Sequence, residues 1–190
     1  MLERKVMSEC KSSEYCRGWN DCFKALIDKY TIPVECKSIR RDFPEQIKLG
    51  KEYKLNRMSV FIDSDGVYAD IYDQQYMPIG TMNLKHFILS FGAYFYDENI
   101  DEKYAMSSES SDFAEGWNDA IVEFTDSIFI PVKCQSIRNS VPFQIKIGEW
   151  YFLNRKSMII DRDGDIFIDV YDTLYHNIGR MNINHFISRR

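Results

Sequence analysis

Gly18-Trp19-Asn20-Asp21 is the stretch that decides how this chain is organised, because the same four residues return as Gly116-Trp117-Asn118-Asp119. The repetition extends well beyond them: 37 of the 74 positions from Tyr15 to Ile88 are identical in a second copy. The copies are 98 residues apart, and 99 apart after a one-residue insertion in the turn that begins at Asp161. Solenoid repeats have much shorter periods, of roughly 20 to 50 residues. The sequence therefore predicts a duplicated domain.

The two copies divide the 190-residue chain into four parts. We expect an N-terminal segment at 1–11, a first repeat at 12–90, an aromatic and acidic connector at 91–109, and a second repeat at 110–190. A domain of this size buries only about 60% of its unfolded surface and is marginally stable alone. We therefore expect the two repeats to pack together with approximate twofold symmetry.

The composition indicates a folded core and limits the classes of function. Hydrophobic residues make up 45% of the chain, with 13 Phe, 12 Tyr and 3 Trp, which is ample for a core. The net charge of −5 argues against non-specific nucleic-acid binding, which depends on phosphate neutralisation by basic residues. No apolar leader or membrane-length apolar stretch is present, so neither secretion nor membrane association is expected. Only Cys36 and Cys134 of the five cysteines are repeated, which predicts reduced thiols and a cytoplasmic location.

Each repeat is predicted to open with a helix. Apolar residues recur at three- and four-residue steps over 15–30 and 113–124, which gives each helix one apolar stripe. Ser12 or Ser13 can cap the first helix, and serines at 110–111 precede the second. Gly18 and Gly116 lie inside these helices, where glycine costs roughly 1 kcal/mol relative to alanine. We expect either the other copy's helix or the sheet to approach the backbone closely there.

After Pro33 and Pro131 the apolar pattern changes to a period of two, which is typical of strands. In the first copy we expect a strand at 34–38, two short strands over 47–55, a hairpin over 60–72, and a strand at 78–82 before a helical turn. Each repeat is then one helix followed by about five short antiparallel strands. This is an α+β fold with small, strongly curved sheets, which usually close on themselves to hide their edges.

The series Lys48-x-Gly50-x-x-Tyr53-x-Leu55, followed by Ile71-Tyr72-Asp73 and Ile79-Gly80-x-Met82, resembles the small SH3-like barrels of many short bacteriophage and bacterial proteins. The Gly-Trp-Asn-Asp phrase of the opening helix also resembles one that recurs in uncharacterised phage proteins. This resemblance implies two tandem SH3-like barrels and a phage or prophage accessory protein. It implies no particular activity, because a fold of this kind hosts many functions.

Two sets of repeated polar residues are candidates for binding. Asn20, Asp21, Asn118 and Asp119 have no packing reason to be repeated on a helix surface; they either hydrogen-bond a neighbouring loop and lock the helix to the sheet, or form a binding surface. The arginines form the second set, because guanidinium groups suit bidentate contacts with anions. They are Arg40, Arg57, Arg138 and Arg155, for which ion pairs with Asp73 and Asp172 are the alternative interpretation.

Asp161, Asp163 and Asp165 are weak metal candidates, because their spacing follows the start of a calcium-binding loop. That loop needs a glycine at its sixth position, where this chain has Ile166, so a hairpin turn is the simpler interpretation. The repeated histidines and cysteines have no patterned partner that would make a general base or an activated thiol. No phosphate-binding loop, zinc-spaced set or nucleophile elbow is present, and we expect no catalytic residue and no cofactor.

These observations favour a non-enzymatic, phage-encoded cytoplasmic protein that engages and modulates a host protein. One alternative is a sponge for a small anionic ligand or nucleotide at the repeated arginines, and another is a nucleic-acid-binding barrel. The copies diverge most at the hairpin tips and at 74–78 against 173–177. We therefore expect the two repeats to present different surfaces to one target.

Overall fold

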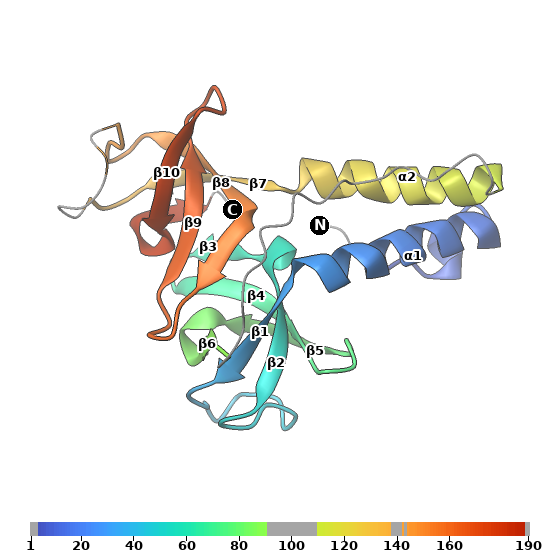
Figure 1. Ribbon diagram of the computed structural model, residues 1–190, viewed down its shortest axis with the longest axis horizontal. Helices are drawn as coiled ribbons and strands as arrows, with labels where there is room; N and C mark the ends of the chain where they lie inside the picture. Colours follow the sequence, from blue (N-terminus) through green and yellow to red (C-terminus); the bar gives the residue numbers. More distant parts are fainter. Residues whose placement is uncertain (1–3, 91–109, 138–141, 143, 189–190) are drawn as a thin grey trace. The chain divides into compact units, whose positions relative to one another are not determined.

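The computed structural model describes residues 4–90, 110–137, 142 and 144–188. The fold is mixed α+β, as predicted: the described residues contain two α-helices and two antiparallel sheets, one of which curls into a half-barrel. They fall into two compact units (Figure 1). The helical unit holds the described residues up to Tyr30 and those from 110 to 128, and the sheet unit holds residues 31–90 and the described residues from 129 onward. The connector expected at 91–109 lies outside the described residues.

The helical unit pairs α1 (Ser13–Tyr30) with α2 (Ser111–Asp126). Both helices are capped by serines within the predicted pairs. The Tyr15 amide donates to Ser12 Oγ at 3.2 Å, and the Phe113 amide donates to Ser110 Oγ at 3.3 Å. Each bond satisfies one of the amides that the first turn of a helix leaves without a partner.

The two helices run parallel (Figure 1), and they touch at their glycines. A Cβ atom added at Gly18 would lie 2.1 Å from the carbonyl oxygen of Phe113, and one added at Gly116 would lie 2.1 Å from that of Tyr15. The close approach predicted from these glycines is therefore confirmed, and the other copy's helix makes it. Because 18 and 116, like 15 and 113, are equivalent positions, the contact is reciprocal.

Sheet A contains the strands of the first repeat, in the order β3-β4-β2-β1-β6, with β5 also paired to β4. All the pairings are antiparallel. The strands are β1 (Thr31–Cys36), β2 (Glu52–Asn56), β3 (Phe61–Asp63), β4 (Gly66–Tyr72), β5 (Pro78–Asn83) and β6 (Phe87–Leu89).

Sheet B contains the strands of the second repeat, in the order β10-β9-β8-β7-β11. They are β7 (Phe129–Cys134), β8 (Trp150–Ile160), β9 (Ile166–Tyr171), β10 (Asn177–Asn182) and β11 (Phe186–Ser188). Equivalent strands pair in the same register: Thr31 lies opposite Asn56, and Phe129 opposite Asn154. Where the first repeat has β2, a 3₁₀ turn at Arg57–Ser59 and β3, the second has the continuous strand β8.

Residues 47–55 do not form the two strands that the alternation predicts. A turn ends at Gly50, whose φ of 72° suits glycine, and a single strand begins at Glu52. The Tyr53 hydroxyl accepts from the Lys48 amide at 2.7 Å and donates to the Gln46 carbonyl at 2.8 Å. Side-chain hydrogen bonds thus give this segment an alternative to sheet pairing.

One hydrophobic core lies within the sheet unit and takes residues from both sheets. Cys36 and Cys134 belong to it, as their place in alternating strands predicts, and each is at most 1% exposed. Fully buried members from the first and second repeats include Val34, Leu55, Ile71, Val132, Leu153 and Ile168.

Candidate functional site

Asn20, the first predicted binding residue, fixes the N-terminal segment to α1. Its Oδ1 accepts from the Lys5 amide and its Nδ2 donates to the Lys5 carbonyl, both at 2.9 Å. The Lys5 ammonium lies 3.4 Å from the centre of the Trp19 ring, within the range of a cation–π contact. Asn20 therefore holds a segment within its own unit.

The other polar residues of the helices have different surroundings. Asp119 accepts a hydrogen bond from the Tyr15 hydroxyl at 2.9 Å. Burial, and then this bond, raise the pKa of Tyr15 to about 12. Asn118 is half-buried and Asp21 is exposed. The four residues thus do not form one cluster of equivalent contacts.

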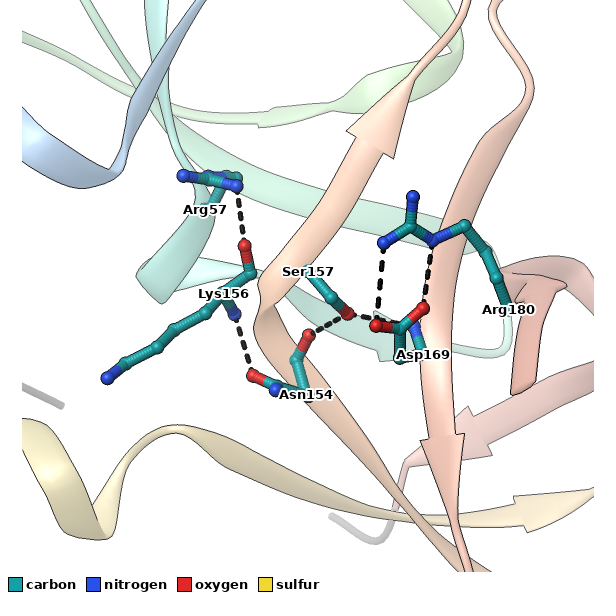
Figure 2. A network of polar contacts seen from close by, with 6 residues as sticks. All are labelled: Arg57, Asn154, Lys156, Ser157, Asp169 and Arg180. Atoms are coloured by element: carbon teal, nitrogen blue, oxygen red, sulfur yellow. Dashed lines mark hydrogen bonds and ion pairs between the residues drawn. The ribbon is translucent and has the colours of Figure 1, made fainter. Parts of the chain in front are cut away.

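Arg57 and Arg155 cross reciprocally between the two repeats, and Figure 2 shows the contact of Arg57. Arg57 Nη1 donates to the carbonyl of Lys156, and Arg155 Nε donates to the carbonyl of Val60 at 2.9 Å. Burial lowers the pKa of Arg155 to about 10, so its guanidinium is still charged at neutral pH and requires acceptors where it lies. Both arginines are thus engaged inside the sheet unit.

A chain of polar contacts continues from this crossing along sheet B (Figure 2). The Lys156 amide donates to Asn154 Oδ1 at 3.0 Å, and Ser157 Oγ donates to the Asn154 carbonyl at 2.7 Å. The Asp169 amide donates to Ser157 Oγ at 2.8 Å, and Arg180 Nε pairs with Asp169 Oδ1 at 2.8 Å.

The first repeat makes the same serine contacts. Ser59 Oγ donates to the Asn56 carbonyl at 2.8 Å and accepts from the Asp70 amide at 2.7 Å. These bonds connect the end of β2 to the neighbouring strand β4. The repeated Asn, Ser and Asp residues therefore have a structural explanation.

Arg40 lies in an exposed loop, and Arg138 lies outside the described residues. Near that loop, His86 is buried and its Nδ1 is 2.7 Å from Ser38 Oγ. Burial, followed by the charges of Lys85 and Arg40, lowers the pKa of His86. Its Nε2 has no hydrogen-bond partner among the described residues, which favours a neutral imidazole.

The aspartates at 161–165 form a turn, as predicted. Asp161 Oδ1 accepts from the amides of Asp163 at 2.9 Å and Asp165 at 2.8 Å, and Lys37 Nζ donates to the Asp163 carbonyl at 2.8 Å. Within residues 4–90, 110–137, 142 and 144–188, no group of three or more His, Cys, Asp or Glu side chains is arranged to hold a metal ion.

A partly exposed aromatic cluster, which sequence reasoning missed, lies on the outer side of sheet B. Phe152 and Tyr175 stack with ring centres 4.7 Å apart and planes 12° apart. Phe129 meets Tyr175 at 5.2 Å, Tyr171 at 5.3 Å and Phe152 at 6.5 Å. We call these four residues the aromatic face.

Two further apolar residues of the second repeat stand out near the aromatic face in the sequence. Trp150 is 38% exposed and lies two positions before Phe152 on β8, so it projects to the same side of the strand. Leu174 is 73% exposed and precedes Tyr175, which is 53% exposed.

The turn that carries Tyr175 is built the same way in both repeats. Asp172 Oδ1 accepts from the amides of Leu174 and His176, and Asp73 Oδ1 from those of Gln75 and Met77. The two central tyrosines have nearly the same left-handed φ, 62° at Tyr76 and 63° at Tyr175. The backbone is thus common to both repeats, and the side chains around it differ.

Sheet A keeps tyrosines at two positions of the aromatic face, Tyr72 and Tyr76, and has polar residues at the other two. The counterparts of Phe129 and Phe152 are Thr31 and Lys54. Lys54 Nζ lies 3.2 Å from the centre of the Tyr76 ring and covers it. A cleft of about 530 Å³ lies beside this turn, lined mainly by polar residues that include Lys51, Glu52, Asp73 and Gln75.

Comparisons of the chain with protein-family models, with curated proteins and with solved structures find no match. In the described part of the chain, neither helix is long and apolar enough to cross a membrane.

Proposed function

We propose that this chain is a non-enzymatic binding protein, phage-encoded, that engages and modulates a host protein through the aromatic face of sheet B and the adjoining Trp150 and Leu174. In this proposal the two halves are copies of one SH3-like unit. The first copy contributes to the shared core and the second presents the main contact surface.

The proposal rests on a difference between equivalent surfaces of the two repeats. On matching turns, the first repeat places Gln75 beside Tyr76, whereas the second places the exposed Leu174 beside Tyr175. Exposed apolar clusters on soluble proteins commonly mark interaction sites, and Tyr and Trp are enriched among the residues that dominate binding energy. Tyr171 and Tyr175 have tyrosine counterparts in the first repeat, whereas Phe129, Phe152, Trp150 and Leu174 have polar ones. A shared fold does not require these four apolar residues on the second repeat alone, so a partner is the simplest reason for them.

Polar groups border the aromatic face, as they do in protein–protein interfaces. The Arg180–Asp169 ion pair lies on the neighbouring strands β9 and β10, and Lys133 is exposed opposite Trp150. The main-chain contacts of Arg57 and Arg155 support this proposal over an anionic-ligand sponge, because both guanidinium groups already have acceptors.

The test uses the tagged full-length chain as bait in a bacterial lysate, followed by mass spectrometry and by titration of the purified partner. The variant Trp150→Glu/Leu174→Gln gives the second repeat the residues that the first repeat has at 52 and 75. Both substitutions are at exposed positions, so the fold should be retained. We expect this variant to weaken binding about 30-fold or more, because even one residue that dominates an interface contributes about 2 kcal/mol or more.

The matched control is Met77→His, which changes an exposed apolar residue of the first repeat to its counterpart in the second. It should leave the dissociation constant unchanged. Equal binding by wild type and the Trp150/Leu174 variant would refute the proposal. Retention of a nucleotide or other anion without any protein partner would favour the sponge instead.

A further inference from the structure

The strand β10 forms one edge of sheet B, and no strand of the described residues pairs with its outer side (Figure 1). An edge strand leaves a row of main-chain N–H and C=O groups without sheet partners. At the other end of the sheet, β11 is only three residues long and lies against β3. Because β10 has six residues, it is the longer and more open of the two edges.

The hairpin between β9 and β10 shows which way the main chain of Asn177 points. The Asp172 amide donates to the His176 carbonyl at 3.0 Å, so the main-chain groups of this pair face each other. Along an antiparallel pair of strands, hydrogen-bonded and non-hydrogen-bonded positions alternate. Asn177 lies opposite Tyr171 at the next position. Its N–H and C=O groups therefore point away from β9, toward the open edge.

The register also places Asn177 at the end of a row that begins in the aromatic face. Phe152 lies opposite Tyr171, and Tyr171 lies opposite Asn177. Residues directly opposite each other share one face of a sheet. Asn177 is exposed, and the turn that carries Leu174 and Tyr175 directly precedes it. A strand added beside β10 would therefore place side chains next to the aromatic face.

We propose that the partner adds an extended segment to β10 as a further strand, so that main-chain hydrogen bonds supplement the contacts of the aromatic face. This inference rests on the proposed function and specifies the partner: an extended polypeptide segment with apolar side chains at alternate positions. In strand addition, main-chain hydrogen bonds supply affinity, and the alternate side chains supply specificity. Those on the outer side of the sheet would adjoin the aromatic face, which favours apolar ones.

The equivalent edge of the first repeat cannot accept such a strand in the same way. Pro78 has the position of Asn177 and lies opposite Tyr72. The Asp73 amide donates to the Met77 carbonyl at 3.0 Å, so the same alternation directs the Pro78 nitrogen to the open edge. Proline has no N–H to donate there. Both edge strands have a register shift beside this position, so the shift does not distinguish the two edges, whereas the proline does.

The test variant is Asn177→Pro, which gives β10 the residue that β5 has. The equivalent strand already contains proline at this position, and the Asn177 amide faces away from β9, so the fold should be retained. Circular dichroism and urea unfolding check this. The matched control is Asn177→Ala, which removes the side chain and keeps the N–H.

Both variants are titrated with the partner captured by the full-length chain. Asn177→Pro should bind about tenfold or more weakly than wild type, because it loses a hydrogen bond and leaves a buried carbonyl of the partner without a donor. Asn177→Ala should bind as wild type does. Wild-type binding by Asn177→Pro, or equal weakening by both variants, would overturn the inference.

A second measurement uses overlapping synthetic peptides that cover the sequence of the captured partner, each long enough to form one strand. One of these peptides should bind the full-length wild-type chain and slow the hydrogen exchange of the Asn177 amide. If the intact partner binds and none of its peptides does, or if that amide exchanges at an unchanged rate, the added strand is wrong.

The Trp150→Glu/Leu174→Gln variant separates this inference from the proposed function. If that variant weakens binding and Asn177→Pro does not, the proposed function holds and the added strand is refuted. If neither variant weakens binding, the proposed function itself fails, and the inference fails with it.

Discussion

Replacing Gly18 by alanine should destabilise the protein, although alanine is the better helix former. In an ordinary helical position this change stabilises by about 1 kcal/mol. Here the new Cβ would lie 2.1 Å from the Phe113 carbonyl oxygen, whereas ordinary van der Waals contact begins at 3.4 Å. The two helices would have to separate locally by more than 1 Å.

The magnitude follows from comparing these two effects. Overpacking a tight contact costs typically 1–3 kcal/mol, and more where the neighbour cannot move away. The obstacle is main chain of the facing helix, so we place the cost at the upper end of that range. After the gain in helix propensity is subtracted, the free energy of unfolding should fall by about 2 kcal/mol.

Urea unfolding, followed by circular dichroism and by tryptophan emission, measures this change. Trp19 and Trp117 lie next to the two glycines, so they report on the helical unit. The control is Ala25→Gly at an exposed position of α1, which should cost only the propensity difference of about 1 kcal/mol. If Gly18→Ala raises the free energy of unfolding, the close helix contact is refuted.

Four further substitutions test contacts within the sheet unit. Tyr53→Phe removes a hydroxyl that both donates and accepts, and should lower the free energy of unfolding in urea by about 1–3 kcal/mol. Arg155→Met leaves the Val60 carbonyl without that donor and should lower the free energy of unfolding by about 2 kcal/mol. Arg180→Met breaks an exposed ion pair and should lower it by less than about 1 kcal/mol. Equal losses for the two variants would contradict the buried hydrogen bond of Arg155. Because the pKa of His86 is lowered in the folded protein, the unfolded chain takes up the proton first as pH falls, so stability should decrease below about pH 6.5. His86→Gln should reduce that decrease, and an unchanged pH profile would count against the buried neutral imidazole.

The helical unit is largely predictable from sequence because its determinants are local. An apolar stripe, serines ahead of the first turn and a repeated mid-helix glycine each have a short-range physical meaning. The glycines also indicate a close contact, since nothing else offsets their cost in a helix. The sequence left open whether a helix or the sheet makes it, because that depends on long-range packing.

The sheet unit was harder to predict. Strand alternation located the hairpin at 60–72, but it wrongly assigned a strand before Gly50, where the Tyr53 hydroxyl orders the turn instead. It also gave no sign that β8 runs without a break where the first repeat has two strands. The crossing of Arg57 was not predictable, because its acceptor is a main-chain carbonyl, which every residue possesses.

The aromatic face combines a predictable part with an unpredictable one. Greater divergence at 173–177 led to the expectation that the two repeats present different surfaces. Phe129 and Phe152 lie at alternate, outward positions of their strands, so strand alternation contained a usable indication. What alternation cannot show is that the turn at Tyr175 brings a ring against Phe152, since this depends on the positive φ at that tyrosine.

Hydrogen–deuterium exchange on the purified complex tests the central claim most directly. With the captured partner bound, we expect slower exchange in residues 150–154 and 171–176 and unchanged exchange in the equivalent residues 52–56 and 72–77. Slower exchange confined to the first repeat, or to the two helices, would contradict the assignment of the aromatic face as the binding surface.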